Sequence, residues 1–375
     1  MLEGNIRLTL LMGPVVPVPM PRPVIEALTG VEVRAAAGEP SGFQLTFAFS
    51  NESPLTTLLL LLGQVGPFIR TVIVVTVNGT PHVLMDGVVV QHQVTPNVET
   101  GQAILTVTGS DLTAVMAFID FTGIPYPAMP AEARVALIIA KYAVFGMIPL
   151  VIPSLFMDVP IPVNRIPTHQ GSDLEYVNKL AEEVGYVFYI EPGPAPGANI
   201  AYWGPEIKVG IPQPALNINM DAHTNVESLS FSFNGASKVM PIVFIQNEET
   251  KIPIPIPIPD ISPLNPPLGL IPPFPTQFKM MRDTAKLNPV QAIALGLAEA
   301  AKTSDAVTGT GSLDVLRYGR LLKARGLVGV RGAGTAFNGL YFVKSVTHKI
   351  KRGEYKQDFT LTRNGLISTV PRVPA

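Results

Sequence analysis

The chain of 375 residues contains no cysteine. This absence excludes disulfide bonds, zinc–thiolate sites and cysteine nucleophiles together. The sequence has five histidines: His82, His92, His169, His223 and His348. None of them has metal-ligand spacing such as HExxH. Asp221 lies near His223, but no nucleophile accompanies them, so a turn is the expected role. The sequence therefore predicts no enzyme, no cofactor, no metal and no catalytic residue.

Charged residues are also scarce. They make up 15% of the chain, against about 25% in typical soluble domains. The mean hydropathy is +0.33. A net charge of −1 provides no basic surface for nucleic acid. Two explanations for this composition compete: a membrane protein, or a subunit that buries much of its surface in an assembly.

Long uninterrupted apolar runs are missing, which weakens the membrane explanation. A spanning helix needs about 20 consecutive apolar residues. The most apolar long stretch, 135–156, is interrupted by Lys141, Gly146, Pro149 and Pro153. The N-terminal residues carry an acid and prolines where a signal peptide needs an apolar core. We therefore expect no stable membrane insertion, no signal peptide, and synthesis and assembly in the cytoplasm.

The residues that are present predict mainly strands with a few helices. Residues 43–49 and 228–233 alternate large apolar with smaller or polar residues, which is typical of strands with one buried face. Asn78-Gly79 predicts a type I′ hairpin turn. Three helices are expected, at 130–143, 173–184 and 288–302. In the second, Ser172 and Glu175 form a capping box and Gly185 ends the helix.

A faint internal repeat indicates a duplicated β unit. Residues 75–112 and 328–366 each contain a valine-rich strand, a glycine turn, a second apolar strand, another glycine turn and an alternating strand. Four glycines are expected to set turns: Gly87, Gly101, Gly339 and Gly353. The predicted fold is mainly β with helical insertions (α+β), with two similar antiparallel β-barrels per chain. A homotrimer of such chains would form a pseudo-hexameric ring that hides apolar surface.

A proline-rich segment, KIPIPIPIPDISP at 251–263, interrupts the second unit. Each proline fixes φ and removes an amide donor, so neither a helix nor a central strand can form and polyproline II is expected. A candidate interface is formed by its isoleucines: Ile252, Ile254, Ile256 and Ile258. They either pack on an adjacent subunit or baseplate partner, or fold back over the same chain.

Three stretches resemble the baseplate hub proteins of contractile injection systems. This is the phage late control protein D family, related to the hub part of type VI secretion spike proteins. The stretches are DGVVVQHQV running into LTVTGSDL at 86–112, SDLEYVNKLAEEVGYVFYI at 172–190, and LVGVRGAGTAFNGLYFVKSVTHKIKRGEYKQDFTLTRNG at 327–365. The last is the most specific, and together the matches spread over nearly the whole chain.

The resemblance implies a structural tail hub, a virion component that joins a sixfold inner tube to a threefold central spike. The implied partners are the chain itself in a homotrimer, the inner tube protein, a spike protein and other baseplate components. Many relatives continue into a needle domain, whereas this sequence ends at LISTVPRVPA, so a separate spike protein is expected. Two other functions stay open: a particle-associated cell-wall hydrolase, and a tail-tube or adaptor subunit.

The expected domain organisation combines these signals. A first tube-like barrel covers 1–118, and an α/β connecting domain covers 119–222. A second barrel is formed by 223–250 with 310–366. The proline-rich arm and a helix at 251–309 are inserted in it, and 367–375 form a C-terminal tail.

Overall fold

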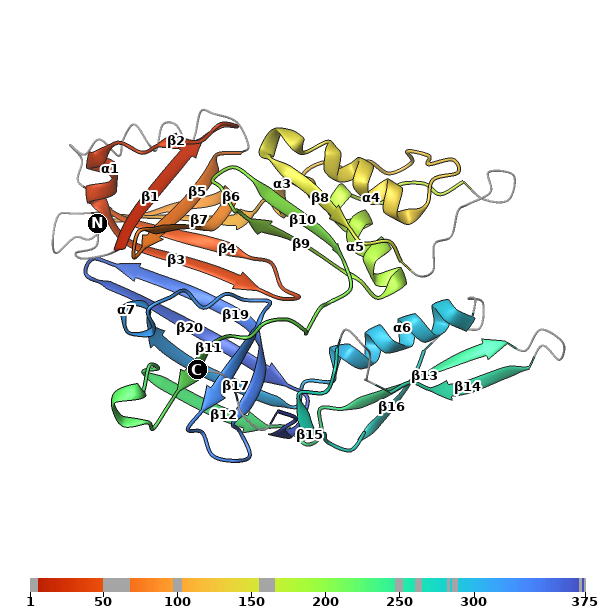
Figure 1. The fold of residues 1–375 in the computed structure, drawn as a ribbon. Helices are drawn as coiled ribbons and strands as arrows, with labels where there is room; N and C mark the ends of the chain where they lie inside the picture. Colours follow the sequence, from red (N-terminus) through yellow and green to blue (C-terminus); the bar gives the residue numbers. More distant parts are fainter. Residues whose placement is uncertain are drawn as a thin grey trace.

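The computed structural model describes residues 6–49, 68–96, 103–154, 166–246, 252–259, 265–281, 284, 289–370 and 373 (Figure 1). The largest element is a 13-stranded sheet in the order β12-β17-β20-β19-β3-β4-β7-β6-β5-β1-β2, with β18 pairing β19 and β11 pairing β18. Its strands are β1 (Ile6–Gly13), β2 (Val18–Pro19), β3 (Leu28–Ala36), β4 (Gly42–Phe49), β5 (Arg70–Val77), β6 (Thr80–Pro96), β7 (Ala103–Asp111), β11 (Gln213–Asn217), β12 (Ser228–Phe233), β17 (Val307–Asp314), β18 (Leu327–Arg331), β19 (Gly339–Lys351) and β20 (Glu354–Arg363).

Each half of this sheet contains the repeated unit expected from the sequence. Strands β5, β6 and β7 form one antiparallel meander, and β18, β19 and β20 form the other. The halves meet where β3 pairs antiparallel with β19, for example at Val33 and His348. One apolar cluster runs across both halves, including Val33 of β3 and Val346 of β19.

The prediction of two closed barrels is not confirmed. Among the described strands the order is open, and no pairing closes either half on itself. The physical reason lies at β3. The edge of β3 that could close the first half is already hydrogen-bonded to β19 of the second half. A single sheet of two similar halves is therefore the observed arrangement.

The short-range predictions agree closely with the structure. Asn78 and Gly79, at φ of 50° and 81°, form the turn between β5 and β6. The helix α5 (Asp173–Val184) begins at Ser172 with both hydrogen bonds of the capping box and ends at Gly185 in the left-handed region. These signals are reliable because they depend on residues only a few positions apart.

A connecting layer packs beside the first half, at the upper right of Figure 1. It consists of a small sheet and helices: β8 (Met147–Val151), β9 (Val187–Pro192), β10 (Asn199–Gly204), α3 (Thr113–Met116), α4 (Ala131–Ala140), α5 and a 3₁₀ turn at Ala143–Phe145. Its own apolar core surrounds the fully buried Trp203. In the described part of the chain, no helix has the length and apolar character needed to cross a membrane.

A three-stranded arm projects from the second half, at the lower right of Figure 1. It contains β13 (Val239–Gln246), β14 (Pro253–Pro257) and β16 (Gln277–Met280), with α6 (Pro289–Lys302) packed against β13. The remaining elements are α1 (Arg22–Ala27), α7 (Val315–Tyr318), a 3₁₀ turn at Asp221–His223, and the pair β15 (Gly269–Ile271) and β21 (Leu366–Ser368).

Candidate functional site

The four predicted turn glycines have different environments. Gly353, at φ +74°, lies in the turn between β19 and β20, as the sequence predicts. Gly339 begins β19 at φ +127°. Gly87 is a correction: it lies inside β6, paired with Thr71 and Asp111, and not in a turn. A Cβ there would lie 2.2 Å from the Ser110 carbonyl oxygen, so close strand approach explains this glycine. The fourth, Gly101, lies outside the described residues.

The isoleucine-proline segment is an edge strand and not polyproline II. Strand β14 pairs antiparallel with β13, and the Ile258 amide donates to the Pro241 carbonyl oxygen at 2.9 Å. The alternation of isoleucine and proline explains how this strand contains so many prolines. Every second residue of an edge strand points its backbone nitrogen away from the neighbouring strand, and in β14 these residues are the prolines, which have no amide hydrogen to donate. Within the chain, Ile256 and Ile258 pack on an apolar cluster with Val243.

The outer two isoleucines of this strand are not covered in the same way. Ile254 is 47% exposed and Ile252 is 61% exposed. Of the two packing modes considered from the sequence, the structure shows packing on the same chain, and packing on a partner stays a prediction. Its inner residues pack on the same chain, and its outer residues remain available to a partner.

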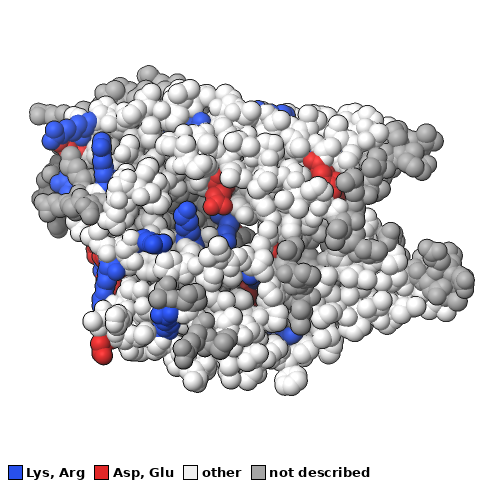
Figure 2. All heavy atoms as spheres, in the orientation of Figure 1, with Lys and Arg blue, Asp and Glu red and all other residues white. Residues whose placement is uncertain are grey.

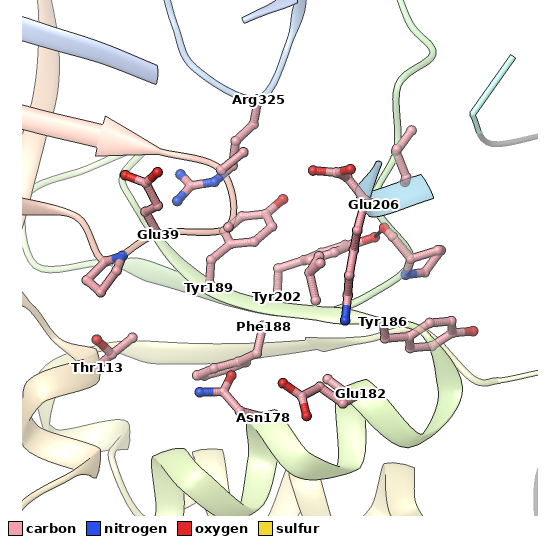
Figure 3. Close-up of a pocket in the computed structure, with 18 of the residues that line it drawn as sticks. Glu39, Thr113, Asn178, Glu182, Tyr186, Phe188, Tyr189, Tyr202, Glu206 and Arg325 are labelled. Atoms are coloured by element: carbon pink, nitrogen blue, oxygen red, sulfur yellow. Dashed lines mark hydrogen bonds between the residues drawn. The ribbon is translucent and has the colours of Figure 1, made fainter. Parts of the chain in front are cut away.

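A cavity of about 530 Å³ lies where the main parts of the chain meet (Figure 3). Its wall includes the residues after β3, helix α5, strands β9 and β10, the end of α6, and the segment before β18. Five aromatic side chains line it: Tyr186, Phe188, Tyr189, Tyr202 and Phe342. The rings of Tyr189 and Tyr202 stack with centroids 4.9 Å apart. Burial raises the pKa of Tyr189 to about 12, so this phenol stays protonated at neutral pH.

Arg325 connects three parts of the molecule at this cavity. Its guanidinium carbon lies 4.2 Å from the centre of the Tyr189 ring, and its Nη2 donates to the Ala36 carbonyl oxygen at 2.6 Å. Its backbone has φ of +61° and donates to the Val343 carbonyl oxygen. Burial lowers the pKa of this guanidinium, while nearby carboxylates, led by Glu191, act in the opposite direction.

Two of the acidic residues of the cavity already have cationic partners. Glu39 forms an ion pair with Arg34, and a Glu206 oxygen lies 3.6 Å from the Lys208 ammonium. Among the described residues, no group of three histidine, aspartate or glutamate side chains could hold a metal ion. The cavity therefore lies at the junction of the two sheet halves and the connecting layer.

A second junction is a buried ion pair. Arg70 of β5 donates through Nε and Nη2 to both carboxylate oxygens of Asp86 in β6, at 2.8 and 2.7 Å. Both side chains are at most 4% exposed. The same guanidinium donates to the Phe145 carbonyl oxygen at 2.6 Å, and the Asn199 amide donates to Asp86 at 2.9 Å. The pair therefore bonds the first half of the sheet to the connecting layer.

Two of the five histidines are buried in hydrogen-bond networks. His169 contacts the Tyr126 hydroxyl at 3.0 Å, and its Nε2 lies 3.5 Å from Asp173, a carboxylate that accepts a hydrogen bond from Lys141. His348 lies 2.8 Å from the Tyr355 hydroxyl. Burial lowers the pKa of His348 to about 4, which keeps this imidazole neutral. The exposed His223 lies in a single 3₁₀ turn beside Asp221.

The buried network of Arg70, Asp86 and Asn199 was not predicted from the sequence. Arg70, Asp86 and Asn199 are far apart in sequence, so no local pattern marks them. One signal in the sequence could have indicated the pair of Arg70 and Asp86. Asp86 and Arg70 occupy apolar strand patterns, where an ionised side chain is unexpected unless it is paired.

Comparisons with known proteins identify the fold. No protein-family model and no curated protein matches the chain. The chain is similar to the tail protein from Neisseria meningitidis MC58, with TM-score 0.61, 12% identity and coverage of 97% of this chain and 98% of that chain. The chain is also similar to the prophage MuSo2 43 kDa tail protein from Shewanella oneidensis, with TM-score 0.61, 13% identity and coverage of 96% of this chain and 98% of that chain.

A third similar structure is a chain of the Francisella PdpA–VgrG complex. It gives a TM-score of 0.63 at 9% identity, covering 100% of this chain and 55% of that chain. At such identities the similarity shows the fold. The chain therefore shares the fold of the two tail proteins and of this chain of the PdpA–VgrG complex. The resemblance found in the sequence is confirmed at that level.

Proposed function

We propose that the chain is a structural hub subunit in the baseplate of a phage tail or a phage-like contractile injection particle. The observation that carries this proposal is the duplicated meander within one continuous sheet. The shared fold with tail proteins supports it, and those relatives are described as tail proteins and not as enzymes.

The proposed assembly is a homotrimer. Each chain contributes two similar halves, so three chains present six similar units around one axis. Such a ring can match a sixfold inner tube on one side and a threefold spike on the other. Its proposed partners are the inner tube protein, a separate spike protein and other baseplate components, all within the assembled particle.

The polar face of the sheet suits the wall of a channel through this ring. Ser228 and Ser230 of β12 contact Ser312 and Thr310 of β17, with oxygen–oxygen distances of 2.9 and 3.0 Å. In the registered strands, Thr310 lies opposite Thr360 of β20. Short hydroxyl side chains carry no charge and have little apolar area, so we expect molecules that pass through the channel to bind its wall weakly.

The low charge of the surface is consistent with extensive subunit contacts. Figure 2 shows lysine and arginine gathered on one side and around a central hollow, while most of the visible face is uncharged. Obligate interfaces are more apolar than ordinary protein surface, and the mostly uncharged face in Figure 2 is consistent with that property.

Mass photometry of the purified chain tests the proposal. Three copies, together with six similar lobes in a low-resolution electron-microscopy reconstruction, are the expected result. Six copies would instead favour a tube or adaptor subunit. A stable monomer would contradict the proposed hub function. The alternative function, a cell-wall hydrolase, would then be assayed on cell-wall polymer.

A further inference from the structure

The two halves of the large sheet have the same strand order. The first half runs β3-β4-β7-β6-β5, and the second half runs β12-β17-β20-β19, with β18 paired to β19. Each strand of the first half therefore has an equivalent in the second half, so that β3 corresponds to β12 and β6 to β19. One irregularity is also repeated. The ladder of β6 with β7 shifts by one residue after Val89, and the ladder of β19 with β20 shifts in the same way after Val343.

The halves are joined along one edge of β19. Residues 339–342 of β19 pair with β18 on this edge, and residues 345–351 pair antiparallel with β3. The junction is well buried, because Val33 of β3 is 0% exposed and its partner His348 is 6% exposed. A strand such as β3 thus fits beside the second part of a strand such as β19.

The equivalent edges at the other ends of the two halves have no partner within the described residues. Residues 80–88 of β6 pair with β5, but no strand that the structure describes pairs with this edge at residues 91–96. Strand β12 likewise pairs only with β17 among the described strands. The two edges lie in different halves, in the upper and lower parts of Figure 1, and are not paired with each other. An unpaired strand edge is a template for a strand of another chain.

We propose that the free edge of β12 pairs antiparallel with residues 91–96 of β6 from a second copy of this chain. The junction between β3 and β19 argues for this occupant, because the same two kinds of edge already pair within the chain. The contact is heterologous, and heterologous contacts that close generate rings. The inference rests on the proposed function, because it names the strands that join the subunits of the proposed ring.

The internal junction also determines the register of the proposed contact. Partners across the sheet, in order, are Val33, Phe43, Gly109 and Val89 in the first half, and Phe231, Gly309, Leu361 and Val343 in the second. Phe231 therefore corresponds to Val33. His348, the partner of Val33, lies five residues after Val343, and Val94 lies five residues after Val89. Phe231 is thus expected opposite Val94 of the next copy.

In this register each face of β12 meets residues of similar character. Val94 is 41% exposed in the single chain, although the equivalent His348 is buried, and the proposed contact places Val94 against Phe231. Polar side chains meet on the other face. The expected pairs are Leu229 with Pro96, Phe231 with Val94, Phe233 with His92, Ser230 with Thr95, and Ser232 with Gln93. A shift by one residue would bring the apolar face of one strand to the polar face of the other.

The backbone donors of β12 point in the direction that this contact needs. The Asn234 amide donates to the Ala306 carbonyl oxygen at 2.8 Å, so even-numbered residues of β12 direct their N–H groups to β17 and odd-numbered residues direct them to the free edge. The edge of β3 uses odd-numbered residues too, since the Ala37 amide donates to the Lys344 carbonyl oxygen at 2.8 Å. Ser232 is therefore expected in a non-hydrogen-bonded pair, in which opposite Cα atoms lie about 4.5 Å apart.

Engineered cysteines test this register, because the chain contains no cysteine. The test variant combines Ser232→Cys with Gln93→Cys, which lie opposite one another across the proposed contact. The matched control combines Ser232→Cys with His92→Cys, whose side chains lie on opposite faces. Both variants are oxidised with copper phenanthroline at micromolar concentration and separated by non-reducing gel electrophoresis. The test variant is expected to give at least about tenfold more covalent dimers and trimers, because cysteines whose side chains point apart cannot be bridged.

A second pair in the same ladder, Ser230→Cys with Thr95→Cys, replaces the first if far-UV circular dichroism shows that the first variant does not fold. Mass photometry of the wild type separates this inference from the proposed function. A trimeric wild type whose test pair cross-links no more than the control overturns the inference and leaves the hub function standing. A monomeric wild type contradicts the hub function. If its test pair also gives no covalent species, the inference is overturned as well, whereas covalent dimers without trimers would support the strand pairing and contradict the ring.

Discussion

The two halves of the large sheet each bury an arginine but satisfy it differently. In the first half, Arg70 has a carboxylate partner, Asp86, and bonds to the connecting layer. In the second half, Arg363 donates to the backbone carbonyl oxygens of Gly365, Asn338 and Ala336, at 2.7, 2.9 and 2.7 Å.

Arg363 also lies over the Tyr341 ring at 4.5 Å, and burial lowers the pKa of its guanidinium. Its hydrogen-bond partners belong to loops of the same half, whereas Arg70 bonds both to Asp86 of its own half and to Phe145 of the connecting layer. The comparison teaches that the buried arginine of the first half links that half to the connecting layer, while the buried arginine of the second half stabilises loops of its own half.

The largest expected effect is the loss of the anchor in the first half. Asp86→Ala leaves Arg70 buried without a counter-charge, which costs about 3–5 kcal/mol of unfolding free energy. The control is Asp358→Ala, which removes an exposed ion pair with Lys349 and costs about 1 kcal/mol or less. Urea denaturation measures both. Equal effects of the two substitutions would contradict the anchoring role.

The second half is expected to respond to acid through His348. Its folded pKa of about 4 lies below the ordinary 6.5, so the unfolded chain binds the proton first as pH falls. Stability from this group is complete above about pH 6.5 and is lost between there and pH 4. The loss amounts to about 3 kcal/mol, from 1.36 kcal/mol per pKa unit.

The measurement for His348 compares urea midpoints of the wild type and His348→Gln from pH 7.5 to 4. The groups that face this imidazole are Tyr355, Gln357 and, at longer range, His82. The difference between wild type and variant should narrow as the pH falls. A constant difference would show that His348 does not titrate in this range on unfolding.

The smallest expected effects distinguish two reasons for glycine. Gly87→Ala should cost about 1–3 kcal/mol because its Cβ meets the Ser110 carbonyl oxygen of the neighbouring strand. Gly353→Ala should cost about 1 kcal/mol because only its positive φ is unfavourable and the space around it is open. Asparagine should be better tolerated than alanine at Gly353 and worse at Gly87. The same ranking at both positions in thermal unfolding would contradict this distinction.

The proline-rich segment shows why some sequence predictions needed correction. Its composition excludes a helix and a central strand, and the structure agrees with both exclusions. The choice between polyproline II and an edge strand depends on whether β13 lies alongside, which no residue within 251–263 reveals.

By itself, the sequence determined the elements whose causes are local: the Asn78-Gly79 hairpin, the capped helix α5, the alternating strands and the scarcity of charge. Only the tertiary structure decided that β3 pairs with β19 and that Arg70 meets Asp86 and Phe145. The physical reason is range. Turn and cap energies arise between residues a few positions apart, whereas these contacts join residues that only the folded chain brings together.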